Sequence, residues 1–112
     1  MCPFCQKPIT KGQRYDMHEG LISRGQVQRS GKESLIFHPC NLVFRHGDSN
    51  LCYHSGGGGG DIGFEISARY LVEHEGYHEV RAWLMSMVTE FSQVGEEALR
   101  RFDTLNLYKE VA

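Results

Sequence analysis

The stretch from Asp16 to His54 holds most of the side chains that could support metal chemistry. His18 and Glu19 follow Asp16 closely, and Asn50 precedes His54 by four residues. Carboxylate, imidazole and amide groups bind divalent cations, and an imidazole is also a general base near neutral pH. We therefore expect metal-dependent chemistry in this stretch, supported by the segments on either side of it.

Cys2 and Cys5 form a Cys-x-x-Cys pair ahead of that stretch. Two thiolates at this spacing fit one tetrahedral ion, and in a reducing compartment cysteines are more often metal ligands or free thiols than disulfides. A chain of 112 residues buries only a modest core, so a structural zinc would add stability. A redox role for the pair is disfavoured, because no parallel βαβ pattern accompanies it.

The length suits a single domain, with a metal-binding core over residues 2–54, a glycine loop over 55–60 and helices over 61–112. No apolar run approaches the length of a membrane span, and the N-terminus lacks the order of a signal peptide. We therefore expect a soluble cytoplasmic protein, in the host cytoplasm if a phage encodes it, with no membrane partner.

Positive charge is concentrated in residues 1–47, which carry seven Lys or Arg against three Asp or Glu, whereas the remainder carries five against eleven. The net charge of −2 argues mildly against nucleic-acid binding, but phosphate neutralisation needs only local positive charge. If DNA is bound, the N-terminal half is the expected contact surface. A polar, glycine-punctuated stretch over residues 23–34 predicts a loop, and its Arg24, Arg29 and Lys32 are the expected phosphate ligands.

Short strands are expected within the N-terminal half. Residues 13–18 alternate as a strand does, which places Asp16 and His18 on one face. The apolar runs 35–37 and 42–44 are separated by a segment with Pro39, where a turn or strand end is expected and where Asn41 enters the second strand. Residues 49–54 would form one helical turn with Asn50 and His54 on the same face.

Helices are expected beyond the five glycines 56–60, which stop any helix before them. Asp61 is a candidate N-cap, Gly76 a candidate break, and a third segment is expected after Gly95. The apolar stripes predict core faces, and the glutamates between them predict solvated faces. The stripes comprise Phe64, Ala68, Leu71 and Val72; then Val80, Trp83, Leu84, Met87, Val88 and Phe91; then Ala98, Leu99, Phe102 and Leu105.

The order of these motifs resembles the HNH (ββα-metal, His-Me finger) endonuclease family, particularly its small phage-encoded members. The matching features are the Cys-x-x-Cys, His18-Glu19, a following Arg-Gly, Asn41-Leu-Val, Asn50 nine residues later and His54 four further on. The resemblance covers residues 2–54, about half of the chain. It implies an α+β fold, with a small zinc-stapled ββα-metal core followed by two to three helices.

The resemblance also implies roles for the site residues. Asn41 would steady the loop that carries the base, while Asn50 and His54 would complete a divalent metal site. The family pattern has His-His or Asp-His in its first element, and two assignments remain here. Either His18 is the general base and Asp16 a metal ligand, or His18 is the ligand and Glu19 the base; neutral imidazole titrates near the working pH, which favours the first.

Two kinds of metal follow from the resemblance. Few protein ligands and oxygen-rich coordination suit Mg²⁺ or Mn²⁺ at the catalytic site, although histidine ligands also admit Ni²⁺ or Zn²⁺. Zinc-stapled members carry a second Cys-x-x-Cys five and eight residues past the middle Asn, where this chain has His46 and Ser49. The expected structural zinc ligands are therefore Cys2, Cys5, His46 and Cys52, with Cys40 as the alternative fourth ligand.

The expected function is hydrolysis of DNA phosphodiester bonds by water that a general base activates, with a single divalent ion. The alternative is a zinc-stapled binding module without catalysis, derived from an HNH fold and serving in phage assembly or DNA packaging. Cleavage of plasmid DNA, with His18→Ala as the control, distinguishes the two. The oligomeric state does not follow from the sequence.

Overall fold

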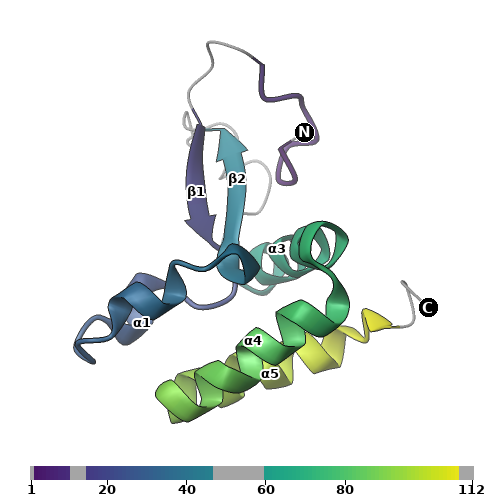
Figure 1. The fold of residues 1–112 in the computed structure, drawn as a ribbon. Coiled ribbons are helices and arrows are strands. Elements are labelled where there is room, and N and C mark those ends of the chain that lie inside the picture. Colours follow the sequence, from purple (N-terminus) through teal and green to yellow (C-terminus); the bar gives the residue numbers. More distant parts are fainter. Residues whose placement is uncertain (1, 11–14, 47–59, 109–112) are drawn as a thin grey trace.

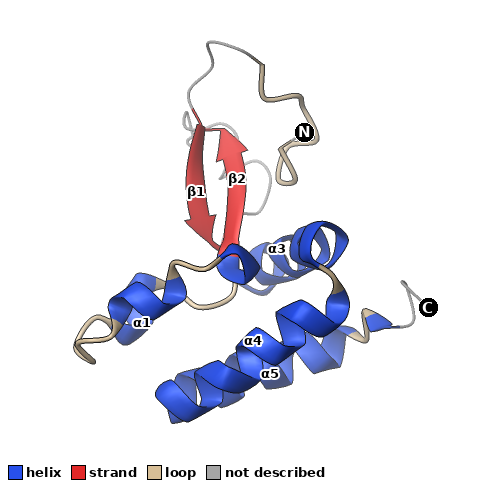
Figure 2. Cartoon of the chain, in the orientation of Figure 1, coloured by secondary structure: helices blue, strands red, loops and turns tan. Residues whose placement is uncertain are grey.

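The computed structural model describes residues 2–10, 15–46 and 60–108, with the backbone alone at residues 15, 16, 45 and 46. This part of the chain combines a two-stranded antiparallel sheet with several helices, and it is mostly helical (Figures 1 and 2). The expected α+β class is therefore confirmed.

The sheet pairs β1, Tyr15–Glu19, with β2, Leu42–His46. The register runs from Glu19 opposite Leu42 to Tyr15 opposite His46. Met17 and Phe44 face each other across the strands and are exposed, whereas Val43, the partner of His18, is fully buried. Because side chains alternate between the faces of a sheet, one face packs on the core and the other meets solvent.

The connection between the strands is more ordered than the sequence predicted. It contains a short helix α1, Arg24–Val27, and two 3₁₀ helices, η1, Glu33–Ile36, and η2, Pro39–Asn41. The prediction of a loop over residues 23–34 was therefore wrong, because the backbone N–H of Ser23 donates to the Gln26 side chain over 2.8 Å and starts the helix. The strand entrance expected after Asn41 is confirmed, since β2 begins at Leu42.

Three long helices form the rest of the described chain: α3, Gly60–Glu75; α4, Tyr77–Glu90; and α5, Ser92–Leu105. The break predicted at Gly76 is confirmed, and its φ of +96° suits a residue without a Cβ. Two finer predictions were wrong. Asp61 lies in the first turn of α3 rather than at its N-cap, because the helix already begins at Gly60, and α5 begins at Ser92 rather than after Gly95.

Gly95 lies inside α5 because the two helices approach each other closely there. A Cβ at this position would lie 2.5 Å from the carbonyl oxygen of Met87 in α4. The turn between the helices is made by Phe91, which has φ −138° and is still buried. The glycine that the sequence suggested as a helix breaker is therefore a packing position.

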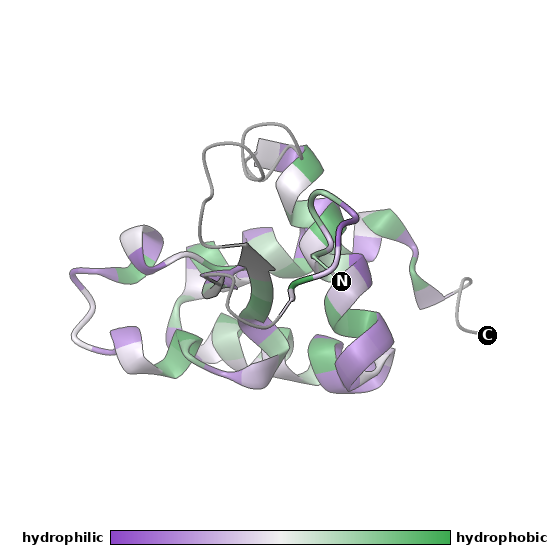
Figure 3. Ribbon diagram, turned by 90° about the horizontal axis from the view of Figure 1, so that it is seen from above, coloured by the Kyte–Doolittle hydropathy of each residue, from purple (hydrophilic) through white to green (hydrophobic). Residues whose placement is uncertain are grey.

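The core lies where α3, α4 and α5 meet one another and the buried side of β2. Figure 3 shows apolar and polar stretches alternating along the helices, as the predicted stripes require. The glutamates expected on solvated faces are exposed. No helix in the described ranges is both long and apolar enough to cross a bilayer. The fully buried side chains from these elements include Val43, Leu71, Val80, Leu84 and Phe102.

Candidate active site

The end of β1 and the first turns of α3 enclose a hollow of about 240 Å³, which we call the site hollow. The strand half of the molecule, residues 2–10 and 15–46, contributes His18 and Glu19, the two residues that the sequence named as candidate bases. The helical half, residues 60–108, contributes the start of α3 and one arginine of α5. The residues lining the hollow are His18, Glu19, Gly20, Leu21, Ser23, Gln26, Gly60, Gly63, Phe64 and Arg101.

His18 is positioned in part by the N-terminal Cys-x-x-Cys segment. The ring of Phe4 meets the imidazole edge-on, with 5.5 Å between the ring centroids and 81° between the planes. Phe4 is itself buried, so it contacts His18 from within the core. A favourable aromatic contact of this kind fixes the orientation of the imidazole.

The backbone around Cys2 and Cys5 forms a closed turn. The N–H of Cys2 donates to the Lys7 carbonyl, and the N–H of Gln6 donates to the Cys2 carbonyl, each over 2.9 Å. Gln6 has φ +62°, a left-handed conformation that few side chains adopt. These contacts hold the two cysteines on one tight turn, as a two-thiolate zinc knuckle requires.

Asn41 anchors the segment that follows His18 and Glu19. Its Oδ1 accepts hydrogen bonds from the N–H groups of Leu21 and Ile22 at 2.8 and 3.0 Å. Its Nδ2 donates to the carbonyls of Ile22 and Ile36 at 2.8 and 2.9 Å. The side chain is fully buried, so all four bonds lie away from water and are costly to break.

Gly20 allows the same segment to lie directly against α3. A Cβ at Gly20 would lie 2.5 Å from Cβ of Ser67 and 3.1 Å from a methyl of Val43. The backbone N–H of Gly20 donates to the Asn41 carbonyl over 2.8 Å. The residue after the candidate bases is thus fixed by close packing and by the Asn41 backbone.

The three expected phosphate ligands lie in different electrostatic environments. Arg24 is well exposed, with its Nε 3.7 Å from Glu19 in the site hollow. Lys32 is held by Glu90 of α4, with 3.1 Å between Nζ and Oε2. Arg29 is exposed. Arg24 is therefore the one of the three whose contacts bring it to the site hollow.

Several expected ligands lie outside the described residues. Asn50, Cys52 and His54 are among them, and so are the side chains of Asp16 and His46. Among the side chains that the structure does describe, no three His, Cys, Asp or Glu residues gather as metal ligands do. The complete ligand sets therefore remain predictions from the sequence.

Cys40, the alternative fourth zinc ligand, is buried in surroundings that favour the neutral thiol over the thiolate. Burial raises its pKa to about 11, and the nearby carboxylates of Glu75 and Glu79 add to the effect. The N–H of Cys40 donates to Nδ1 of His38, whose ring stacks on Trp83. Because zinc binds the thiolate, a zinc ion at Cys40 would have to displace the proton against this shift.

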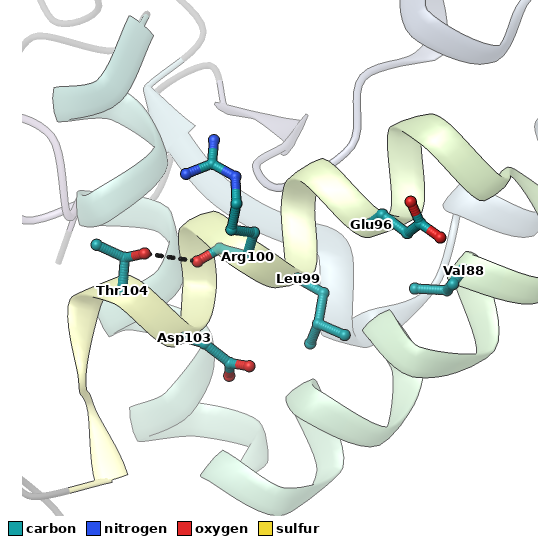
Figure 4. A pocket seen from close by; sticks show the side chains of 6 residues that line it. All are labelled: Val88, Glu96, Leu99, Arg100, Asp103 and Thr104. Carbon is teal, nitrogen blue, oxygen red and sulfur yellow. Dashed lines mark hydrogen bonds between the residues drawn. The ribbon is translucent and has the colours of Figure 1, made fainter.

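A second hollow lies on the outer side of α4 and α5 and is shown in Figure 4. Val88 and Leu99 form its apolar floor. Two of its ionic side chains have partners close by: Arg100 pairs with Glu97, and Asp103 accepts two hydrogen bonds from Arg81 at 2.9 Å. It holds no histidine or cysteine, so it offers less chemistry than the site hollow.

Comparisons with models of protein families, with curated proteins and with solved structures found no match to this chain. The residue that sequence reasoning missed is Arg101, which lines the site hollow from α5. No local pattern could have found it, because its position follows from the packing of α5 on α3.

Proposed function

We propose that this chain is a metal-dependent DNA endonuclease of the HNH type. Support comes from the resemblance over residues 2–54 and from the surroundings of the residues that carry it. The two strands and the long connection between them are the first elements that a ββα core needs, and the helical turn expected over residues 49–54 would be its third element.

Asn41 is the observation that carries the proposal. The family's middle Asn steadies the loop beside the base, and the buried Asn41 amide makes four hydrogen bonds to the backbone of just such a segment. The bonds to Leu21 and Ile22 fix the chain directly after Glu19, so they set where the candidate bases stand.

In the proposed reaction His18 takes one proton from a water molecule. The water oxygen forms a bond to phosphorus, the bond from phosphorus to the leaving sugar oxygen breaks, and that oxygen takes a proton from solvent. Phe4 keeps the imidazole in place. In the alternative assignment Glu19 accepts the proton, and His18 binds the metal.

The catalytic ion, Mg²⁺ or Mn²⁺, would stabilise charge on the phosphate and the leaving oxygen when bound. Asp16 or His18, with Asn50 and His54, would hold it. The imidazole and carboxylate at the end of β1 are donors that suit such an ion. The closed turn of Cys2 and Cys5 likewise suits a structural zinc, with His46 and Cys52 completing the set.

The test of the proposal is cleavage of supercoiled plasmid with Mg²⁺, Mn²⁺ or Ni²⁺. We expect His18→Ala to lose roughly 10²- to 10⁴-fold in rate as the base, or its metal affinity as a ligand, while keeping the fold. His78→Ala, an exposed histidine of α4, is the matched control. Cleavage by a folded His18→Ala protein at the wild-type rate would contradict the nuclease assignment of this site. The non-catalytic binding module would then be the remaining proposal.

Metal titration separates the two roles of His18. If His18 is a ligand, excess Mn²⁺ partly restores His18→Ala, and Glu19→Gln is the more damaging change at saturating metal. If His18 is the base, added metal does not help, and Asp16→Asn shows the metal-dependent defect. Rates measured against metal concentration for the three variants give the answer.

The structural zinc has its own test. We expect elemental analysis of chelator-washed protein to find tightly bound zinc, and Cys2→Ser to lose it together with much of the stability. Cys40→Ser should keep the zinc, because Cys40 is in surroundings that favour the thiol. Wild-type protein without zinc and with unchanged thermal stability after chelation would remove this part of the proposal.

A further inference from the structure

Arg101 of α5 reaches the site hollow from the half of the molecule that lies outside the HNH-like motif. Its guanidinium carbon lies 4.1 Å from the centroid of the Phe64 ring, and its Nη2 donates to Asp61 over 2.9 Å. The arginine side chain is 27% exposed. The side chain therefore links α5 to the start of α3, and Arg101 is one of the residues that line the hollow.

The ion pair with Asp61 does not account for this placement. The Asp61 side chain is 97% exposed, and a pair with a fully solvated carboxylate contributes little to stability. A solvated partner is also easily exchanged for another anion. The contact with Phe64 occupies a face of the guanidinium, and its N–H donors stay available for an oxyanion acceptor.

The charges around the hollow favour an anion at Arg101. Among the described residues that line the hollow, Arg101 is the one Lys or Arg. The backbone at the start of α3, with Gly60 and Gly63, lines the same space, and a helix N-terminus favours negative charge. Glu19 is acidic and pairs with Arg24, so it offsets the positive charge of that arginine. A phosphate placed beside Glu19 therefore needs a second cation.

We propose that Arg101 binds the phosphate of DNA in the site hollow and that Asp61 occupies its donors until DNA displaces it. This inference rests on the proposed function, since DNA is the ligand. It assigns part of the substrate site to α5 and therefore makes the helical half a participant in binding. A planar guanidinium suits this task, because its paired donors match two phosphate oxygens.

The experiment measures binding of a short fluorescent DNA duplex by anisotropy between about 50 and 200 mM salt. No divalent ion is added, so that binding is measured apart from cleavage. We expect Arg101→Gln to weaken binding roughly 10-fold and to lower the salt slope by about one. Arg100→Gln is the matched control, because Arg100 directly precedes Arg101 in α5. Arg100 pairs with Glu97 and lines the other hollow, which Figure 4 shows.

A second variant keeps the test decisive if Arg101→Gln unfolds. Asp61→Asn frees Arg101, and we expect it to bind DNA a few-fold more tightly than Glu96→Gln, which removes one acidic charge from α5. Where Arg101→Gln is folded, the gain should vanish in the double variant that also carries Arg101→Gln. Equal effects of Asp61→Asn and Glu96→Gln, or of Arg101→Gln and Arg100→Gln, would overturn the inference.

The result also separates this inference from the proposed function. Wild-type protein that binds DNA through Arg101 but cleaves nothing would end the nuclease proposal and keep the phosphate site. Cleavage by the wild type, with Arg101→Gln binding as Arg100→Gln does, would end the role of Arg101 alone. Wild-type protein that binds no DNA would overturn both.

Discussion

Asn41 and Phe102 are both fully buried, but they stabilise the two halves of the molecule in different ways. Phe102 lies among the apolar side chains of the helical half, residues 60–108, which includes Leu71 and Leu84. Asn41 lies in the strand half, residues 2–10 and 15–46, where its four hydrogen bonds tie the segment after β1 to the 3₁₀ helices. Both halves bury apolar side chains, and the strand half adds directed polar contacts at its centre.

The difference explains why the candidate bases belong to the strand half. Apolar packing tolerates changes of shape when the volume is kept, whereas a buried hydrogen-bond network specifies one arrangement. On the proposed function, catalysis would need groups held to within a fraction of an ångström, and the directed contacts beside His18 and Glu19 would provide this. The helical half supplies the platform and, on our inference, the arginine that holds phosphate.

The largest expected losses of unfolding free energy are those of Asn41→Ala and Phe102→Ala, and the two variants are compared directly. Truncating a buried phenylalanine costs about 3–5 kcal/mol. Losing the Asn41 amide leaves two N–H and two carbonyl groups without their partner, at about 1–3 kcal/mol for each group that stays unsatisfied. Urea unfolding should therefore show comparable losses of several kcal/mol in the two variants.

Cleavage rates then sharpen the comparison. At a temperature where both variants are folded, Asn41→Ala should lose far more activity than Phe102→Ala, because only Asn41 sets the position of the segment after Glu19. Equal losses of activity at equal stability would show that the site depends on the whole core rather than on the polar anchor.

Gly95→Ala is expected to have the next largest effect, on the helical half alone. The new Cβ would meet the backbone of Met87 at 2.5 Å, and backbone cannot move aside as a side chain can. Overpacking of this kind costs about 1–3 kcal/mol, which thermal or urea unfolding would measure.

The control for this substitution is Gly25→Ala in α1. A Cβ there has Ser23 Oγ at 4.0 Å as its nearest neighbour, so the change should be neutral or stabilising. If the two substitutions behaved alike, close contact between α4 and α5 would not be the reason for Gly95.

The two halves also differ in how far the sequence predicted them. The apolar stripes predicted the helices and their core faces, because periodic burial is a local pattern with a long-range result. In the strand half β1 and β2 were predicted, but the apolar run 35–37 falls at the 3₁₀ helix η1 rather than in a strand. The helix α1 was not predicted, although Ser23 and Gln26 have the spacing of a capping box. Asn41 was assigned its role by resemblance, and its partners Leu21 and Ile36 could not be read from a pattern.

The parts that escaped prediction are contacts between residues distant in the chain. Arg101 entered the site hollow only when α5 was packed against α3. The sequence predicted a helix break at Gly95, because a glycine inside a helix costs stability. The structure keeps Gly95 inside α5, because the backbone of α4 occupies the space that a side chain would need. Both depend on tertiary geometry, which composition and spacing do not report.

The pH dependence of the unfolding free energy tests how Cys40 of the strand half packs beside Glu75 and Glu79 of the helical half. Its raised pKa means that the folded state keeps the proton more strongly than the unfolded chain, whose thiol has a pKa near 9.0. The stabilisation is complete below about pH 9 and is lost as the pH rises toward 11. Urea unfolding across this range should show a smaller decline for Cys40→Ala than for the wild type, and equal declines would mean that the thiol is better solvated than the structure indicates.

Ser67→Ala has the smallest expected effect and the opposite sign. Ser67 is fully buried in α3 beneath Gly20, and among the buried side-chain N and O atoms of the described chain its hydroxyl oxygen is the one without a hydrogen-bond partner. A buried hydroxyl without a partner is unfavourable, so its removal should stabilise the protein by about 1 kcal/mol, while the Cβ that packs against Gly20 is kept. The measurement is the free energy of unfolding in urea. Loss of stability in Ser67→Ala would mean that the hydroxyl does find a partner, and the junction beneath the site would then be a polar anchor like Asn41 rather than an apolar contact.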